Sequence, residues 1–407
     1  MMTTRQFSLR PESELLVWCA RTAMTDAFRE RIRQRVQEPL DWAAVLDLAW
    51  YHGVGPLLYQ NLSTLCSDLV PAESLTQLRQ RTQAGALLNR LLAQELVVLC
   101  EAFEAHGVPV MPIKGATLAA SAYGDLTLRD FSDMDLLVPE GSIAEAEAVL
   151  RALGYEGKDP SSDSGEMDNE EGPYHVFIKK RTLFRVDLQC VMAHQHFVFR
   201  LDRPEFWQHR MPVALANKTV QGLAPEDLLI LLCVHGSKHA WEALKWVCDV
   251  AELLRAHDHM DWDRIFSSAS TWRCRRLVLM GLSLAHLVLD APLPEVVVAR
   301  LSADSDVRML SHRMPSTLLA DRHAGVNEAQ AVALYFSLKD SWWERWRFGL
   351  MLCRDQSPIA LVPPPWFRWH TSLPRVAWLL CPLHWAMRSL AHSSIRGAIN
   401  RWVEHGG

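Results

Sequence analysis

The chain has 407 residues, of which 49% are hydrophobic, with a formal net charge of −5 and a sequence pI of about 6.4. This length and composition allow a sizeable buried core divided among roughly two or three domains. The weakly acidic balance argues against a general electrostatic attraction to nucleic acid or to an anionic membrane. We therefore expect no salt-sensitive retention on duplex DNA or RNA.

Cysteine usage and hydropathy bear on the compartment in which the protein works. The nine cysteines are scattered and include no Cys-x-x-Cys pair, which is typical of free thiols in a reducing compartment. Residues 1–14 lack the apolar centre of a signal peptide. No uncharged apolar run reaches the roughly 18 residues of a membrane span. These features predict a cytoplasmic protein without a transmembrane segment.

Residues 1–105 are predicted to form an N-terminal helical region. Apolar residues recur at spacings of three and four in residues 12–23, 41–52, 74–82 and 84–106. A leucine stripe in the last of these segments is interpreted as core rather than as a binding groove. It consists of Leu87, Leu88, Leu91, Leu92 and Leu96.

The second predicted domain, residues 106–200, opens with a change of pattern. Residues 108–113 are typical of a short strand, Lys114-Gly115 of a turn, and residues 116–123 of a helix. A strand, a glycine turn and a helix start together present backbone N–H groups and a positive dipole end to a phosphate. This turn is therefore a candidate phosphate-binding element.

Asp133 and Asp135 precede the apolar run Leu136 to Val138. Residues two apart on a strand point to the same face, so this pattern places two carboxylates side by side. Such a pair repels and raises one pKa unless a cation lies between the two groups. Mg²⁺ suits hard oxygen ligands and is usually bound by one or two carboxylates with substrate phosphates. The alternative is a pair of loop acids that only caps a turn.

Four short stretches stand out around this turn and strand: Lys114-Gly115, Tyr123-Gly124-Asp125, Arg129 and Ser132 to Val138. They resemble the DNA polymerase β-like nucleotidyltransferase superfamily, in particular a bacterial branch of poorly characterised proteins. The resemblance implies that Lys114, Gly115, Arg129 and Ser132 bind the nucleotide. It also implies that Asp133 and Asp135 bind two Mg²⁺ ions, for which Mn²⁺ is an alternative. Ala116 departs from the superfamily pattern, which has Ser or Gly at that position.

Asp187 lies in a predicted strand, residues 183–190, whose other face is apolar. An unpaired charge would be costly there. The sequence alone leaves open an ion pair with Arg185 or Arg129, or an edge strand with a hydrated face. The resemblance implies that Asp187 is the third catalytic carboxylate and a metal ligand, on a strand beside the aspartate pair.

The segment from Gly157 to Pro173 combines acidic residues with Gly, Ser and Pro. Such a composition is typical of a solvated loop. A Ca²⁺ site is the less favoured alternative because the acidic residues do not have the spacing of an EF-hand loop.

Residues 201–300 are predicted to form a helical domain with polar residues on one helical face. The residues on that face are His235, His239, Glu242, Trp246 and Asp249. Histidines four apart suggest zinc, but Gly236 stands where a zinc-protease helix has its catalytic Glu. The resemblance extends to this string and implies that it supports the metal face or shapes a nucleotide or acceptor pocket. A purely structural network is an equal alternative. The residues concerned are His235, Lys238, His239, Trp241, Lys245 and Asp249.

Residues 301–407 are predicted to form a C-terminal helical region rich in Trp and Arg. Two stretches, residues 342–347 and 363–369, interleave aromatic and arginine side chains. Such stretches can stack on nucleobases or lie at a membrane interface. We favour a helical layer whose tryptophans pack on the rest of the protein.

Together these features predict an α+β protein, in which a small mixed β-sheet nucleotidyltransferase core is flanked by N-terminal and C-terminal helical regions. The resemblance implies transfer of a nucleoside monophosphate from an NTP to a hydroxyl of an acceptor. A protein, a peptide, a small molecule and a tRNA end all stay open as acceptors. Tailoring of a peptide natural product is one such role. The alternative is a non-catalytic nucleotide-binding regulatory or scaffold protein.

Overall fold

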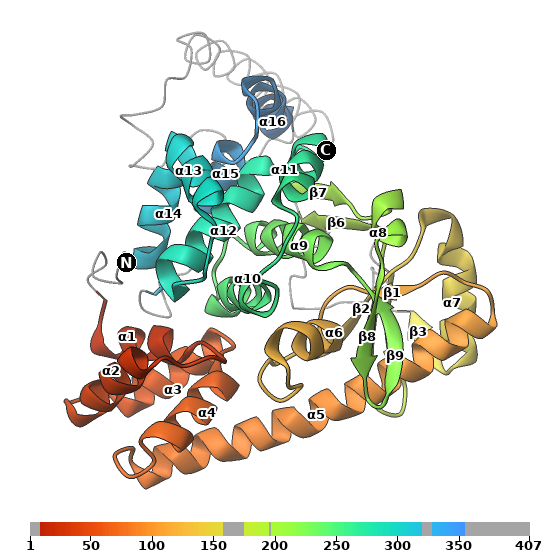
Figure 1. Ribbon diagram of the computed structural model, residues 1–407. Helices are drawn as coiled ribbons and strands as arrows, with labels where there is room; N and C mark the ends of the chain where they lie inside the picture. The colour runs from red at the N-terminus through yellow and green to blue at the C-terminus, as the bar shows by residue number, and fades with distance from the viewer. Residues whose placement is uncertain (1–8, 158–174, 195–196, 320–327, 355–407) are drawn as a thin grey trace, which may run out of the picture. The chain divides into compact units, whose positions relative to one another are not determined.

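The computed structural model describes residues 9–157, 175–194, 197–319 and 328–354 (Figure 1). The chain divides into two compact units, Met1–Asn327 with Ser337–Asp340, and Glu328–Phe336 with Ser341–Gly407. The predicted α+β fold is confirmed, because the first unit combines many helices with a small mixed sheet. The three boundaries between the four domains expected from the sequence stay predictions.

Five helices precede the sheet. They are α1 (Pro11–Cys19), α2 (Asp26–Gln37), α3 (Trp42–Tyr51), α4 (Gly55–Leu65) and α5 (Ala72–Ala105). The side chains of Thr25 and Asp41 cap α2 and α3 by accepting backbone N–H groups. The two helices predicted for residues 74–82 and 84–106 are instead one 34-residue helix, α5.

The leucine stripe of α5 is divided between two environments, which corrects the expectation that all of it is core. Leu92 and Leu96 are each only 1% exposed, whereas Leu87 is 59% exposed and Leu88 and Leu91 are also exposed. The reason is helical geometry. Five leucines within ten positions cover more of the helix circumference than the one face that packs on the sheet.

The sheet that follows has the strand order β1-β2-β5-β4-β3. Its strands are β1 (Met111–Pro112), β2 (Asp133–Leu137), β3 (Tyr155–Gly157), β4 (His175–Lys179) and β5 (Arg185–Gln189). The central strands β2 and β5 are parallel, and the other pairs are antiparallel. The two strands with the predicted carboxylates are therefore direct neighbours.

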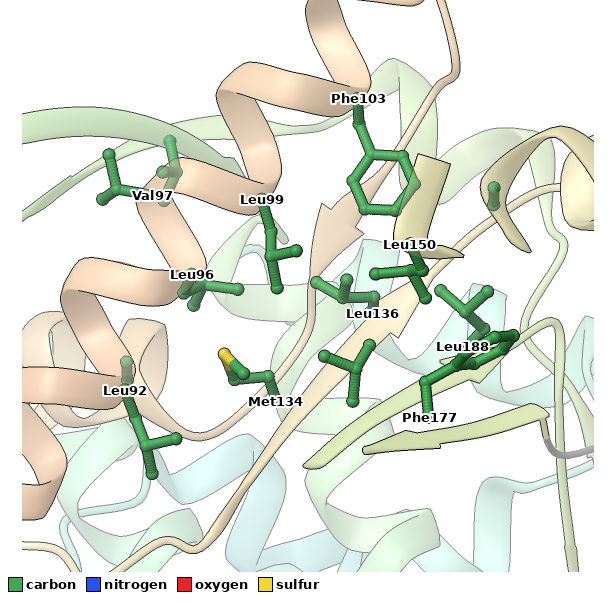
Figure 2. Packing of buried hydrophobic residues seen from close by; sticks show 14 of the residues in the cluster. Leu92, Leu96, Val97, Leu99, Phe103, Met134, Leu136, Leu150, Phe177 and Leu188 are labelled. Atoms are coloured by element: carbon green, nitrogen blue, oxygen red, sulfur yellow. The ribbon is translucent and has the colours of Figure 1, made fainter. Parts of the chain in front are cut away.

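One face of the sheet packs on helices and forms the core shown in Figure 2. Leu96 and Phe103 of α5 and Leu150 of α7 (Ile143–Ala152) meet Met134 and Leu136 of β2 there. Side chains alternate along a strand, so burial of positions 134 and 136 directs positions 133 and 135 to the opposite face. Packing of the core thus determines where the acidic side chains lie.

Two hairpins and a helical region complete the first unit. The hairpins are β6 (Val191–His194) with β7 (Phe197–Arg200) and β8 (Met211–Leu215) with β9 (Lys218–Gly222); α8 (Pro204–Gln208) lies between them in sequence. The helices are α9 (Pro225–Lys238), α10 (Leu244–Ala256), α11 (Trp262–Thr271), α12 (Arg275–Leu289), α13 (Glu295–Ala303) and α14 (Ser305–Leu318). No helix within the described ranges has both the length and the apolar character that a membrane crossing requires.

The described part of the second unit belongs to α15 (Glu328–Ser337) and α16 (Trp342–Arg354). On α16 the side chains of Trp342, Trp343 and Trp346 are exposed, and the rings of Trp343 and Trp346 stack with centroids 4.8 Å apart. The second tryptophan-rich stretch, residues 363–369, lies outside the described residues, as does most of the acidic segment expected to be a loop.

Candidate functional site

An open cavity of about 230 Å³ lies on the face of the sheet opposite the core and is bordered by α9 and α10. Most residues singled out from the sequence line it: Lys114, Gly115, Arg129, Ser132, Asp133, Asp135, Asp187, His235, Lys238, His239 and Lys245. Trp241 and Asp249 do not line it. The fold therefore gathers residues from two predicted regions, 106–200 and 201–300, into one site.

The three carboxylates converge at the floor of this cavity. The parallel register of β2 and β5 places Asp135 opposite Asp187 and Asp133 opposite Arg185. One oxygen from each of Asp133, Asp135 and Asp187 lies within 4.8 Å of the others, and Asp135 and Asp187 are each 6% exposed. Oxygen-only donors at this separation fit a divalent cation such as Mg²⁺.

Side chains of the protein already neutralise two of these acids. Lys114 Nζ is 3.1 Å from Asp135 Oδ2, and the Gln189 amide donates a hydrogen bond to Asp135 Oδ1. Arg185 donates two hydrogen bonds to Asp187, of 2.8 Å from Nε and 3.0 Å from Nη2. Of the alternatives that the sequence allowed for Asp187, the structure shows the ion pair with Arg185. Asp187 also belongs to the cluster of three carboxylates.

The electrostatics of the cluster are dominated by mutual repulsion and burial. The carboxylate of Asp135, and then burial, raises the pKa of Asp133. Burial raises the pKa of Asp187 to about 6, and the hydrogen bonds from Arg185 oppose that rise. A bound cation would favour the charged form of these acids.

The predicted glycine turn lies directly against the acidic strand. Gly115 has φ 58° and ψ −120°, a conformation that side-chain-bearing residues rarely adopt. A Cβ at this position would lie 3.4 Å from the carbonyl oxygen of Asp133. After the turn the chain forms the short α6 (Ala116–Leu118) and a π-helical turn, Ala119–Tyr123. The strand–turn–helix arrangement expected from the sequence is present, with a shorter strand.

Arg129 lines the cavity, but its guanidinium is held from α10. Arg129 donates hydrogen bonds of 2.7 and 2.9 Å to the two carboxylate oxygens of Asp249, which also accepts a bond of 2.7 Å from the Tyr123 hydroxyl. The Asn89 amide of α5 donates to the carbonyls of Leu126 and Arg129. The loop before β2 is therefore fixed from two distant helices, and phosphate binding by Arg129 stays a prediction.

The histidine face is not one continuous helix, which corrects the expectation from sequence. Helix α9 ends at Lys238, and Ala240 and Trp241 have left-handed backbone conformations before α10 begins. The aromatic side chains meet nevertheless. The rings of His239 and Trp246 stack with centroids 4.7 Å apart. The rings of His235 and His239 are T-shaped to each other, also with centroids 4.7 Å apart. The two helices meet at this aromatic wall of the cavity.

Trp241 has a packing role. It is fully buried, and a Cβ on Gly236 would lie 2.4 Å from its ring. Gly236 therefore makes room for Trp241, since any side chain there would collide with the indole. This contact gives a structural reason for Gly236, the residue that stands where a zinc-protease helix has its catalytic Glu.

We expect no stoichiometric zinc at His235 and His239. Within the described residues, Asp133, Asp135 and Asp187 are the only group of three or more potential ligands placed to share a metal. Burial, above all, lowers the pKa of His235, and its Nδ1 lacks a hydrogen-bond partner. Elemental analysis should find no zinc, and zinc chelators should leave the melting temperature unchanged. One zinc per chain that is lost in His239→Ala would contradict this prediction.

His52 connects the N-terminal helices to the cavity wall. Its Nδ1 accepts the Leu244 N–H at 3.3 Å, and its carbonyl accepts the Lys245 N–H at 3.0 Å. Burial lowers the pKa of His52 to about 4 from its ordinary 6.5. Because the folded protein prefers the neutral ring, proton uptake favours unfolding below pH 6.5. The stability present above that pH should fall progressively until the ring titrates in the folded state near pH 4.

The test is denaturant unfolding across this pH range in the parent and in His52→Asn, which retains a hydrogen-bond acceptor. The parent should lose up to roughly 3 kcal/mol more of its free energy of unfolding than the variant does. Other groups titrate equally in both proteins, so the difference isolates His52. Parallel pH dependences would show that His52 is not the group responsible.

Comparison with known proteins adds a family. Residues 38–290 match the family described as uncharacterised nucleotidyltransferase. Among solved structures, the antibiotic-resistance factor ANT(2'')-Ia is similar, with 15% sequence identity and a TM-score of 0.33, over 47% of this chain and 96% of that chain. None of the curated proteins matches the chain. Because the family match extends over more than half of the 407 residues, the protein belongs to this nucleotidyltransferase family.

Proposed function

We propose that this protein is a metal-dependent, polymerase β-like nucleotidyltransferase that moves a nucleoside monophosphate from an NTP to an acceptor hydroxyl. The observation that carries the proposal is the convergence of three carboxylates on neighbouring parallel strands beside a glycine turn. Membership of a nucleotidyltransferase family supports it.

The acidic cluster fits a pair of divalent cations because every donor is a carboxylate oxygen and all three lie in one cavity. Asp133 and Asp135 would hold both ions, and Asp187 would complete the site beside the acceptor. Bound Mg²⁺ would supply charge neutralisation at the phosphates and activation of the attacking hydroxyl. The protein would contribute position, since its rigid strands hold the carboxylates in register.

The charges around the cavity suit an anionic substrate. Five cationic residues line it (Lys114, Arg129, Arg185, Lys238 and Lys245) against four acidic ones (Asp130, Asp133, Asp135 and Asp187). The whole chain, in contrast, carries a net charge of −5. Because Arg129 is paired with Asp249, which does not line the cavity, the protein charges nearly balance there, and bound divalent cations would supply the positive charge that attracts a triphosphate. Lys114 and the Gly115 turn, with Ser132, are the proposed phosphate side.

The acceptor would contact the part of the cavity lined by α9 and α10. There the aromatic wall of His235, His239 and Trp246 presents stacked rings next to Lys238 and Lys245. A surface of this kind contacts planar groups well. A protein, a peptide, including a peptide natural product, and a small molecule are the acceptor classes we propose to test first.

One observation favours a second candidate, a non-catalytic nucleotide-binding or scaffold protein. Both oxygens of Asp187 are engaged by Arg185, and this pairing weakens Asp187 as a metal ligand for as long as it persists. Ala116, at the position where the superfamily has Ser or Gly, points the same way. Catalysis itself separates the two candidates.

The deciding experiment incubates the protein with each NTP in turn, Mg²⁺ or Mn²⁺, and a lysate of the producing organism. The NTP is labelled at either the α- or the γ-phosphate. Nucleotidyl transfer should label an acceptor from the α position only, because the γ-phosphate leaves with pyrophosphate. An Asp133→Asn variant is the matched control and should label nothing. Transfer of the γ label, or α labelling equal in parent and variant, would reject the proposal.

A further inference from the structure

The acidic cluster is largely occupied by groups of the protein itself. Lys114 and Gln189 each engage one oxygen of Asp135, and Arg185 engages both oxygens of Asp187. Within the described residues, the Asp133 carboxylate makes no hydrogen bond or ion pair. Four of the six carboxylate oxygens are therefore engaged, and only Asp133 offers both of its oxygens.

The pair between Arg185 and Asp187 is the bidentate one among these contacts. Two parallel hydrogen bonds between a guanidinium and a carboxylate are charge-assisted and have a fixed geometry. Asp187 is buried, so loss of its partner would leave a charge with little solvation. A cation that binds through Asp187 must either share these oxygens with Arg185 or displace its hydrogen bonds.

Adding a divalent cation alone is electrostatically unfavourable here. The ion would lie near the Lys114 ammonium and the Arg185 guanidinium, which repel it across a cavity of reduced dielectric constant. A triphosphate changes this balance, because it brings several negative charges to the same cavity. Its oxygens are acceptors that match the guanidinium fork as well as a carboxylate does.

We propose that Arg185 is a positioning residue that holds Asp187 until a metal–nucleotide complex binds and then transfers its hydrogen bonds to phosphate oxygens. This inference rests on the proposed nucleotidyltransferase function. Its consequence is that the protein binds divalent cations weakly without nucleotide and tightly with it. The nucleotide would in this way control assembly of the metal site.

The chain contains a matched control pair. Arg200 and Asp202 have the same spacing, and Arg200 donates to both carboxylate oxygens, at 2.9 Å from Nε and at 2.5 Å from Nη2. Neither residue lines the cavity, and Arg200 is exposed. Arg200→Met therefore removes a bidentate pair of the same spacing, together with the contact between Arg200 and Glu140, without touching the proposed site.

The test is calorimetric titration of Mn²⁺ into nucleotide-free protein. Arg185→Met should bind Mn²⁺ at least about tenfold more tightly than the parent, because the competing cation is gone. Arg200→Met should bind Mn²⁺ like the parent, and Arg185→Met combined with Asp187→Asn should lose the gain. Arg185→Lys keeps a cation but not the fork, and should show an intermediate gain if Arg185→Met is unstable.

A second titration uses a non-hydrolysable NTP with Mn²⁺ and separates this inference from the proposed function. Arg185→Met should bind the Mn²⁺–nucleotide complex at least about tenfold more weakly than the parent, because a phosphate ligand is lost. Equal nucleotide-free Mn²⁺ affinity in the parent, Arg185→Met and Arg185→Lys would overturn the role of Arg185 alone, provided that the parent binds Mn²⁺ with the nucleotide. A parent that binds no Mn²⁺ with the nucleotide would overturn the proposed function as well.

Discussion

Replacing Asp187 by Asn is expected to lower the rate of nucleotidyl transfer by about a hundredfold or more, while Mg–NTP binding stays within a few-fold of the parent. The reason is the proposed division of labour, in which Asp187 contacts only the ion that activates the acceptor hydroxyl. A loss of that size corresponds to roughly 2.7 kcal/mol of transition-state stabilisation. The Asn side chain keeps one oxygen that can accept a hydrogen bond from Arg185.

Single-turnover rates and calorimetry with a non-hydrolysable NTP would measure the two quantities separately. Asp202→Asn, on the pair outside the cavity, is the control and should retain both parental values. If Asp187→Asn folds normally and transfers at the parental rate, the third metal ligand is another residue.

Replacing Asp133 or Asp135 by Asn is expected to weaken both nucleotide binding and transfer. Each substitution removes a carboxylate that would hold both ions, and charge-assisted contacts of this kind are the strong ones. We expect at least about a tenfold loss of Mg–NTP affinity and a loss of transfer no smaller than that of Asp187→Asn. The same titrations and rate measurements give both numbers.

The two substitutions should differ in their effect on the neighbouring cations. Asp135→Asn removes the ion-pair partner of Lys114, whereas Asp133 has no such partner among the described residues. Asp135→Asn should therefore also change the free energy of unfolding more than Asp133→Asn does. Parental nucleotide binding in all three Asn variants would refute the metal site altogether.

Local sequence patterns predict the acidic floor of the cavity. An Asp-x-Asp before an apolar run, and a second alternating strand with Asp187, each determine which side chains share a face. The same alternation also places Arg185 and Gln189 beside Asp187, at positions two residues away. The strand alternation therefore also predicts Arg185 and Gln189 as residues of the candidate site.

Other parts of the site had no local signal. Asn89 and Asp249 lie far along the chain from the loop that they hold, and only packing brings them to Arg129. The helical period predicted one continuous face through His235 and Asp249, but the chain breaks at Ala240 and Trp241. The buried indole of Trp241 requires that break, because its ring occupies the space beside Gly236.

The sequence by itself determined the α+β class, the glycine turn and the strands that carry the three carboxylates. These features depend on residues that are adjacent or two apart in the sequence. Within a strand or a turn, that spacing determines the direction in which each side chain points. Tertiary structure alone decided which cation neutralises which acid, and that His239 stacks on Trp246 across the gap between two helices. Ion pairs and ring contacts between separate elements depend on how buried faces pack, and no local period encodes that packing.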